Sequence, residues 1–247
     1  MMDPEAPINK FRRGRQAQGR DTKILITSRN STTGTGKTTL AVWLALNWDH
    51  YGFRAEKATL EPSEYIEKYL ETRPGEVLIM DEAEQLDARR SMSSQNVDFA
   101  DRWQQLRYRQ VDSILTLPTS SALDKRLEEL ADIWINVTSR GYAQVHKTTV
   151  NDRTKEINQI PLQTITWPDI SDHDVKLELD KKKKKKNEEQ TKIEKKKEEM
   201  EDPEKVRKET RNQLIKSFYE YDGMTQKDIG ELVGMSRRRV GQILNES

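Results

Sequence analysis

A glycine-rich segment near the N-terminus, NSTTGTGKTT at residues 30–39, has the residue types of a phosphate-binding loop. The pattern is G-x-x-x-x-G-K-S/T. Gly36, Lys37 and Thr38 supply its end, and Ser31 stands where the first glycine belongs. In such a loop the lysine ammonium neutralises nucleotide phosphates and the following hydroxyl binds Mg²⁺. Because serine is small, we expect a working loop of slightly altered geometry. The predicted nucleotide contacts are Ser31, Thr32, Thr33, Gly34, Thr35, Gly36, Lys37, Thr38 and Thr39.

A second chemical signal is a pair of carboxylates behind an apolar run. Residues 77–80 read VLIM and are followed directly by Asp81 and Glu82. An exposed Asp-Glu pair would mean little, but a buried strand delivers both groups to the sheet edge that the loop occupies. Asp81, with Thr38, is predicted to hold Mg²⁺, and Glu82 to polarise the attacking water. ATP and Mg²⁺ are therefore the expected ligands, with Lys37 and Glu82 catalytic.

Hydrolysis also requires groups that respond to the γ-phosphate and stabilise its charge. The run SILTLPT at residues 113–119 contains two polar groups near its end, Thr116 and Thr119, and Thr119 is the predicted sensor. A neighbouring subunit can supply an arginine for charge stabilisation. We favour Arg107 and Arg109 for this role, although each arginine taken singly is more typical of a solvated helix face. The full set of candidate arginines is Arg102, Arg107, Arg109 and Arg126.

The last 24 residues, MTQKDIGELVGMSRRRVGQILNES at 224–247, have the pattern of a helix-turn-helix. Gly234 supplies the tight turn and Ser236 caps the second helix. Three consecutive arginines then lie at the leading end of that helix, where a recognition helix meets bases and phosphates. The alternative is a helical hairpin that packs on another protein. The predicted contacts with duplex DNA are Ser236, Arg237, Arg238 and Arg239.

The elements that must position these groups alternate between strand and helix. Strands are expected at 23–28, 56–60, 76–82, 113–119 and 133–137, and helices at 38–48, from 62, at 98–110 and at 122–131. Such alternation predicts a three-layer α/β domain with a mostly parallel sheet. Residues 142–150 and 156–167 flank a turn-like segment and predict an antiparallel hairpin at the sheet edge. The C-terminal helix-turn-helix would form a small all-α domain.

The flanking segments are strongly charged and set the domain limits. The expected organisation is a flexible basic arm at 1–20, an ATPase domain at 21–170, a charged linker or helix at 171–205, and the helix-turn-helix domain at 206–247. The linker contains the run KKKKKK at 181–186 but no sustained apolar heptad, so a solvated spacer is favoured over a DNA-binding tract.

Composition excludes several classes of protein. Charged residues make up 34% of the chain, so part of it is expected outside a packed core. There are no cysteines, which excludes disulfides and thiol chemistry, and the 3 histidines are scattered. No apolar run approaches the roughly 18 residues of a membrane span. The simplest expectation is a soluble protein of the cytoplasm.

Residues 22–170 resemble the additional-strand P-loop ATPases of the FtsK–HerA type, in the branch of Zot-like and viral packaging or DNA-transfer ATPases. The resemblance is carried by the STTGTGKTT loop, the VLIMDEAEQ segment and the stretch RYRQVDSILTLPTSSALDKRLEELADIWI at 107–135. It implies a P-loop NTPase fold and a homo-oligomeric, often hexameric, motor that acts on DNA. The C-terminal segment is similar to the generic helix-turn-helix of many transcription factors.

Three functions remain open from the sequence. The leading interpretation is a DNA-stimulated ATPase motor for viral or plasmid DNA packaging or transfer. The alternative is a regulator whose nucleotide state controls DNA binding without translocation. A small-molecule phosphotransferase is a weaker possibility, because no segment has the pattern of an acceptor pocket.

Overall fold

The computed structural model describes residues 2–28, 34–83, 94–118, 125–151, 153–154, 156–201, 203–220 and 223–245. The chain divides into two compact units, Met1–Lys183 and Lys184–Ser247. The first unit contains a sheet covered by helices, and the second contains the later turns of one long helix followed by three shorter helices.

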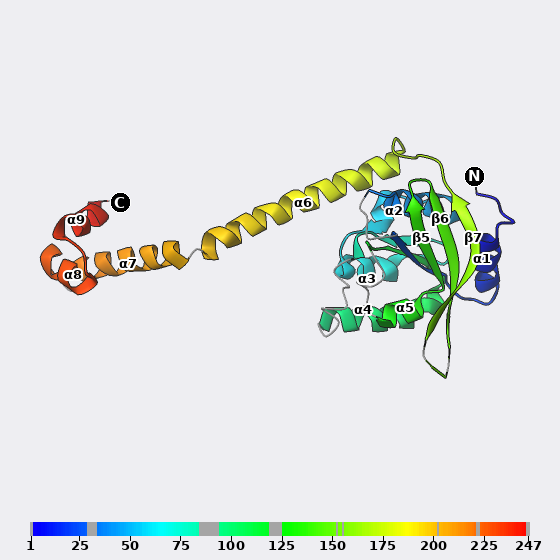
Figure 1. Ribbon diagram of the computed structural model, residues 1–247, viewed down its shortest axis with the longest axis horizontal. Coiled ribbons are helices and arrows are strands. Elements are labelled where there is room, and N and C mark those ends of the chain that lie inside the picture. The colour runs from blue at the N-terminus through cyan, green and yellow to red at the C-terminus, as the bar shows by residue number, and fades with distance from the viewer. Residues whose placement is uncertain are drawn as a thin grey trace. The chain divides into compact units, whose positions relative to one another are not determined.

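The first unit is built on a seven-stranded sheet with the strand order β2-β3-β4-β1-β5-β6-β7. Figure 1 labels its last three strands, β5, β6 and β7. The strands are β1 (Lys23–Ser28), β2 (Ala58–Thr59), β3 (Val77–Met80), β4 (Asp112–Thr116), β5 (Ile133–Ser139), β6 (Tyr142–Val150) and β7 (Ile157–Thr166). The pairings from β2 to β5 are parallel, and β1 lies between β4 and β5. The pairings β5–β6 and β6–β7 are antiparallel. The predicted mostly parallel sheet with an edge hairpin is confirmed.

Helices cover both faces of this sheet, which gives the three layers expected from the sequence. One face packs against α1 (Pro7–Ala17), α2 (Lys37–Trp48) and the first turns of α6 (Asp174–Glu201). The other face packs against α3 (Pro62–Glu71), α4 (Ser94–Gln105) and α5 (Lys125–Leu130). Short 3₁₀ turns, η2 (Ala55–Lys57) and η5 (Leu106–Arg109), precede β2 and β4. Each face therefore has its own apolar core.

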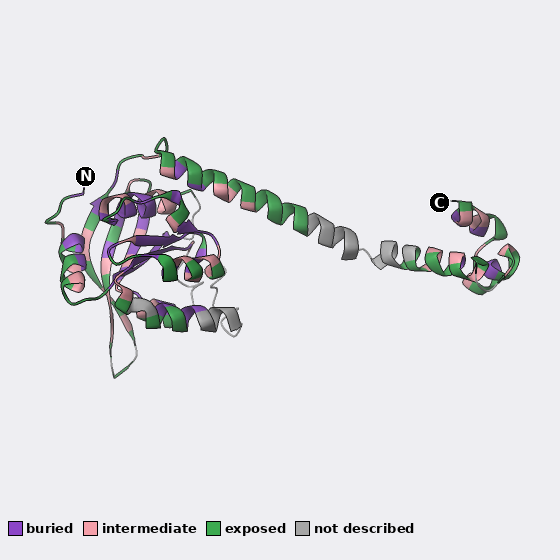
Figure 2. Cartoon of the chain, turned by 180° about the vertical axis from the view of Figure 1, so that it is seen from behind, coloured by how far each residue is buried: buried purple, intermediate pink, exposed green. Residues whose placement is uncertain are grey.

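The burial of the strands follows their sequence pattern. All residues of β1, β3 and β4 are buried, as continuous apolar runs between two helical layers require. In β6 buried Ala143 and Val145 alternate with exposed neighbours, which is typical of a strand covered on one face. Figure 2 shows this contrast as purple central strands and a mixed green and pink edge hairpin. The buried central strands bring their carboxyl ends to one edge, where the site lies.

The N-terminal segment differs from the flexible basic arm expected for residues 1–20. Residues 7–17 form α1, and Ile8 is fully buried in the core. Arg12 Nε lies 2.5 Å from Asp112 Oδ2, and Arg12 also donates to the backbone oxygen of Trp48 at 2.7 Å. Arg15 pairs with Asp132 at 2.8 Å. Basic residues that suggested a solvated arm thus pair with carboxylates next to the amino ends of β4 and β5.

The charged segment after the hairpin is helical. The sequence left a solvated helix and a disordered linker open, and residues 174–201 form α6. Leu179 on its first turns is fully buried with the core of the first unit, which therefore extends beyond the expected limit at residue 170. Much of the remaining helix is exposed, as the green ribbon in Figure 2 shows. Among the described helices, none is both long and apolar enough to cross a bilayer.

The second unit contains the rest of α6 and a small three-helix structure. Its helices are α7 (Pro203–Glu220), α8 (Gln226–Val233) and α9 (Arg237–Asn245). A capping box joins the Thr225 hydroxyl and Asp228 at the start of α8. Gly234 ends α8 with a φ of 68°, in the left-handed region that a tight turn to α9 requires. The buried core residues are Ile215, Ile229, Val240 and Ile243.

Candidate functional site

The end of the predicted phosphate loop leads from β1 into α2. Gly34 and Gly36 have φ angles of 72° and 95°, in the left-handed region that favours glycine. Lys37 Nζ donates to the hydroxyl of Ser28 at 3.2 Å, which ties the loop lysine to the end of β1. The predicted contacts Ser31, Thr32 and Thr33 lie outside the described residues. In the described part of the loop, glycine therefore stands at the two positions where the backbone takes a left-handed conformation.

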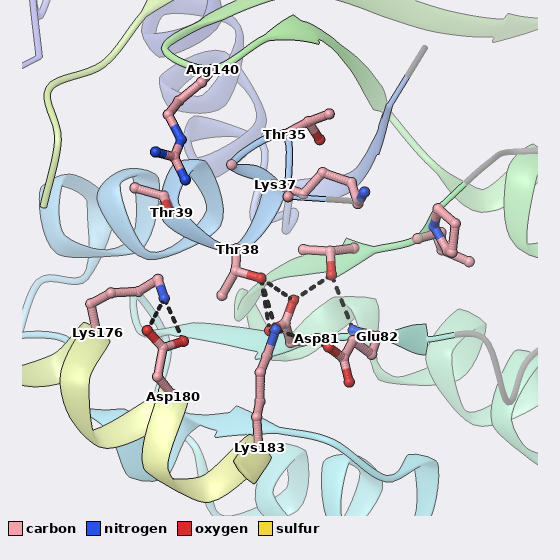
Figure 3. Close-up of a pocket in the computed structure, with 15 residues that line it drawn as sticks. Thr35, Lys37, Thr38, Thr39, Asp81, Glu82, Arg140, Lys176, Asp180 and Lys183 are labelled. Atoms are coloured by element: carbon pink, nitrogen blue, oxygen red, sulfur yellow. Dashed lines mark hydrogen bonds and ion pairs between the residues drawn. The ribbon is translucent and has the colours of Figure 1, made fainter. Parts of the chain in front are cut away.

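A cavity of about 280 Å³ opens beside this loop (Figure 3). Its walls come from the loop and α2, from the ends of β3 and β4, from the β5–β6 turn, and from the first turns of α6. The lining residues are Gly34, Thr35, Gly36, Lys37, Thr38, Thr39, Asp81, Glu82, Thr116, Leu117, Pro118, Arg140, Lys176, Asp180 and Lys183. Six of the nine predicted nucleotide contacts and both predicted carboxylates therefore share one cavity.

Asp81 is the central carboxylate of the cavity. It is fully buried at the end of β3. The hydroxyl of Thr38 lies 3.0 Å from both carboxylate oxygens of Asp81. The hydroxyl of Thr116, at the end of β4, donates to Asp81 Oδ1. The carboxylate is therefore held in place by hydroxyls from two different elements, and one of them is the hydroxyl predicted to bind Mg²⁺.

Glu82 lies beside Asp81 in a strained backbone conformation. Its φ is 57°, which is uncommon for a residue other than glycine and costs about 1–3 kcal/mol. Its backbone N–H donates to the Thr116 hydroxyl at 3.1 Å. The carboxylate is 45% exposed, so water from the cavity reaches it. This arrangement suits a group that binds and deprotonates water.

Thr116 connects these two carboxylate residues. It accepts from the backbone of Glu82 and donates to Asp81, and it is nearly fully buried. Sequence reasoning identified Thr116 as a polar group at the strand end but favoured Thr119 as the sensor. Thr119 lies outside the described residues, so its role stays a prediction.

Lys183 of α6 is a component of the site that sequence reasoning missed. Its ammonium nitrogen lies 2.5 Å from Asp81 Oδ2, 3.1 Å from Glu82 Oε1 and 3.0 Å from the Thr38 hydroxyl oxygen. Burial is the largest single influence on the pKa of Lys183 and lowers it, but the two carboxylates together hold that pKa above its ordinary value. Lys183 is therefore a cation within the carboxylate pair.

Arg140 is a second cation that the sequence did not reveal. It lies in the turn between β5 and β6 and lines the cavity next to the loop (Figure 3). Trp167, just after β7, lies against the same part of the loop, because a Cβ atom at Gly36 would be 3.6 Å from its ring. The hairpin thus closes one side of the cavity. No spacing in the sequence links this turn to the loop, about 100 residues earlier.

The arginines predicted from the sequence lie elsewhere in this chain. Arg109 donates to the backbone oxygens of Leu70 and Thr72 at 2.7 and 3.2 Å, so it holds the end of α3. Arg107 belongs to η5, and its side chain is outside the described part of the structure. Neither Arg102 on α4 nor Arg126 on α5 lines the cavity. A role for Arg107 or Arg109 in a neighbouring subunit stays a prediction.

The residues of the cavity fit a magnesium–nucleotide complex. Mg²⁺ binds one or two carboxylates together with phosphate oxygens, and Thr38 and Asp81 place a hydroxyl and a carboxylate side by side. The Thr35 hydroxyl is enclosed and has no hydrogen-bond partner among the described residues. The ammonium of Lys183 among these oxygens shows that the cluster attracts a cation. Thr38, Asp81 and the loop thus have the chemistry to hold both a metal ion and phosphate groups.

Comparison with known proteins gives structural likenesses only. No family model matches the chain, and no curated protein matches its sequence. The N-terminal domain of zonular occludens toxin from Neisseria meningitidis is similar at 18% identity and a TM-score of 0.40, over 63% of this chain and 98% of that one. The genome packaging NTPase B204 of Sulfolobus turreted icosahedral virus 2, in complex with ATP-gammaS, is similar at 13% identity and a TM-score of 0.36, over 58% and 98%. The functional assignment therefore rests on the site.

Proposed function

We propose that this chain binds ATP with Mg²⁺ and hydrolyses it. The observation that carries the proposal is the convergence of Lys37, Thr38, Asp81 and Glu82 on one cavity, from segments more than 40 residues apart in the sequence. A glycine-rich turn that matched the loop pattern by chance would not be expected to have two carboxylates and a buried threonine beside it.

Each residue has a distinct task in this proposal. Lys37 binds the β- and γ-phosphates, while Thr38 and Asp81 hold the metal. Mg²⁺, when bound, neutralises phosphate charge and orients the triphosphate. Glu82 accepts the proton of the attacking water on its carboxylate, and Thr116 fixes the direction of Asp81 and the backbone of Glu82. Arg140 adds positive charge on the hairpin side of the cavity.

We further propose that the second unit binds duplex DNA as a helix-turn-helix. The turn at Gly234, the capping by Ser236 and the small buried core support it. Ser236 Oγ accepts from the Arg239 backbone at 3.3 Å, so it caps α9. Arg237 and Arg238 are exposed at the start of that helix, and Arg239 is half-buried. An exposed cationic helix end is suited to phosphates and base edges.

With both activities, the chain would be a DNA-associated ATPase motor that acts in viral or plasmid DNA packaging or transfer as a homo-oligomeric ring; the resemblance implies that such rings are often hexameric. The sequence resemblance supports this setting. The alternative is a nucleotide-controlled DNA-binding regulator that does not translocate DNA. The contact of Lys183 with Asp81 and Glu82 supports this alternative, because it connects the proposed nucleotide site to α6, and a change at one could then alter the other.

Steady-state ATP hydrolysis with and without duplex DNA tests the proposal. We expect turnover that rises on DNA and disappears in Lys37→Ala. Lys125→Ala is the control, because Lys125 is a largely exposed lysine of α5 that does not line the cavity. Slow turnover that is indifferent to DNA, in a protein that still binds ATP, would favour the regulator. Absence of ATP binding to the unaltered protein would overturn the nucleotide assignment.

A further inference from the structure

The position of Lys183 raises a question about metal binding. Its ammonium contacts the Thr38 hydroxyl, Asp81 Oδ2 and Glu82 Oε1, all within 3.1 Å. These are the side chains that the proposed function assigns to Mg²⁺ and to the attacking water. In Figure 3 the Lys183 side chain extends from α6 into the cluster, and dashed lines join it to these oxygens. The lysine therefore contacts the oxygens that the proposed function assigns to the metal and to the attacking water.

The docking of α6 on the first unit holds Lys183 there. Leu179, one turn earlier on the helix, is fully buried in the core. The neighbouring Lys182 donates to the backbone oxygen of Ala58 at 3.0 Å and pairs with Glu64 at 2.7 Å. Lys176 pairs with Asp180 on the cavity side of the same helix. The ammonium is thus placed by an apolar anchor and an adjacent ion pair, and its side chain is only 17% exposed.

A lysine ammonium and a divalent cation cannot share these oxygens. Mg²⁺ binds its ligand oxygens at about 2.0–2.1 Å, so it would need the positions that the ammonium takes beside these oxygens. An ammonium and a divalent cation within about 4 Å also repel each other strongly in a poorly solvated site, and two carboxylates carry less negative charge than the two cations together. We propose that Lys183 is a tethered cation of the metal site, and that Mg²⁺ with its nucleotide binds only after Lys183 withdraws. This inference rests on the proposed assignment of Thr38 and Asp81 to Mg²⁺.

The consequence is a coupling between nucleotide binding and α6. Thermodynamic linkage makes the coupling reciprocal: Mg–nucleotide weakens the docking of α6, and whatever pulls α6 away raises the affinity for Mg–nucleotide. α6 continues to Glu201, beyond the end of the first compact unit at Lys183. A partner or load that acts on this helix therefore regulates the ATP site through Lys183.

The test is the Mg²⁺ dependence of nucleotide binding in the full chain. The affinity for a fluorescent, non-hydrolysable ATP analogue is measured over a series of Mg²⁺ concentrations, so the readout is binding and not turnover. Lys183→Ala is expected to lower the Mg²⁺ concentration for half-maximal binding by about tenfold, the effect of removing one competing interaction of modest strength. Lys184→Ala, at the exposed neighbouring position, is the matched control and is expected to behave like the unaltered chain.

A second variant tests the coupling without removing the lysine. Leu179→Ala weakens the apolar anchor of α6 but keeps Lys183, and it is expected to lower the Mg²⁺ requirement in the same direction. An unchanged or higher requirement in Lys183→Ala would overturn the inference, since the lysine would then be a bystander or a phosphate ligand. If the unaltered chain binds no nucleotide at any Mg²⁺ concentration, the proposed function fails; if it binds and Lys183→Ala changes nothing, only this inference fails.

Discussion

The hydroxyl of Thr116 at the end of β4 donates a hydrogen bond to the buried carboxylate of Asp81 at the end of β3. These strands are parallel neighbours, so their carboxyl ends bring the two side chains together. The same hydroxyl oxygen accepts the backbone N–H of Glu82. Thr116 is therefore a positioning residue for both carboxylates of the proposed ATPase.

Substitution of Thr116 should lower turnover more than nucleotide binding. Thr116→Val removes the hydroxyl at similar volume, and an unmade hydrogen bond at a buried group costs about 1–3 kcal/mol. We expect kcat to fall about 10- to 100-fold, with KM changed much less because Lys37 and the loop are intact. Thr116→Ser keeps the hydroxyl and is the control. An equal loss in both variants, measured by steady-state kinetics, would indicate a packing role instead.

The two carboxylates should differ in the step that each supports. Glu82→Gln keeps the size and backbone of the residue but removes the base, so turnover should fall by about 10²- to 10⁴-fold while ATP still binds. Asp81→Asn should instead raise the Mg²⁺ concentration needed for binding, since it removes a metal ligand. Parallel titrations of ATP and Mg²⁺ separate the two effects. Identical behaviour of the two variants would contradict their separate roles.

The sequence predicted the parts of the site that local patterns encode. The end of the phosphate loop follows a short local motif, and the carboxylates follow a continuous apolar run, VLIM. The edge hairpin follows the two-residue alternation of strands around a turn. The contributions of Lys183 and Arg140 were not readable. Lys183 is one of six consecutive lysines, and no feature of that run marks it as the one that contacts Asp81 and Glu82.

The interpretation of the N-terminus was wrong for a related reason. A count of basic residues describes charge but not the partners that neutralise it. Asp112 and Asp132, the partners of Arg12 and Arg15, lie about 100 residues or more away in the sequence. Charge complementarity over that separation has no local signature, so only the folded structure distinguishes a docked helix from a solvated arm.

The docked helix α1 predicts a stability effect that a flexible arm would not have. Arg12→Ala leaves Asp112 fully buried without its cation, and loss of one partner of a buried pair typically costs about 3–5 kcal/mol. Arg13→Ala is the matched control, because its side chain is 49% exposed and its partner Glu5 is on the surface. Urea unfolding of both variants provides the comparison. Equal stability of the two would mean that α1 does not support the domain.

The turn of the three-helix unit depends on close approach at Gly230. A Cβ atom there would lie 2.6 Å from the backbone oxygen of Met235, which has no room to move without shifting the turn. Gly230→Ala should therefore destabilise the second unit by about 1–3 kcal/mol. At Gly241 the nearest atoms belong to the Gln226 side chain, so Gly241→Ala is the tolerant control. Thermal unfolding of the full chain is expected to show a lowered transition only for Gly230→Ala.

The exposed arginines of α9 should carry the DNA binding proposed for the second unit. Arg237→Ala combined with Arg238→Ala removes two cations from the start of the helix. Each lost phosphate contact makes the slope of the logarithm of the binding constant against the logarithm of the salt concentration shallower by roughly one. We expect weaker binding to duplex DNA and a salt slope shallower by about two.

Lys125→Ala is the control for this experiment, since Lys125 is an exposed cation of the first unit, near Glu129 on α5. Fluorescence anisotropy with one duplex over a range of salt concentrations gives both affinity and slope. If the salt slope is unchanged in the double variant and the Lys125 control loses DNA binding, the DNA-binding surface lies on the first unit and not on α9. It would leave the three-helix unit as a candidate protein-binding module, which is the alternative that the same helix pattern allows.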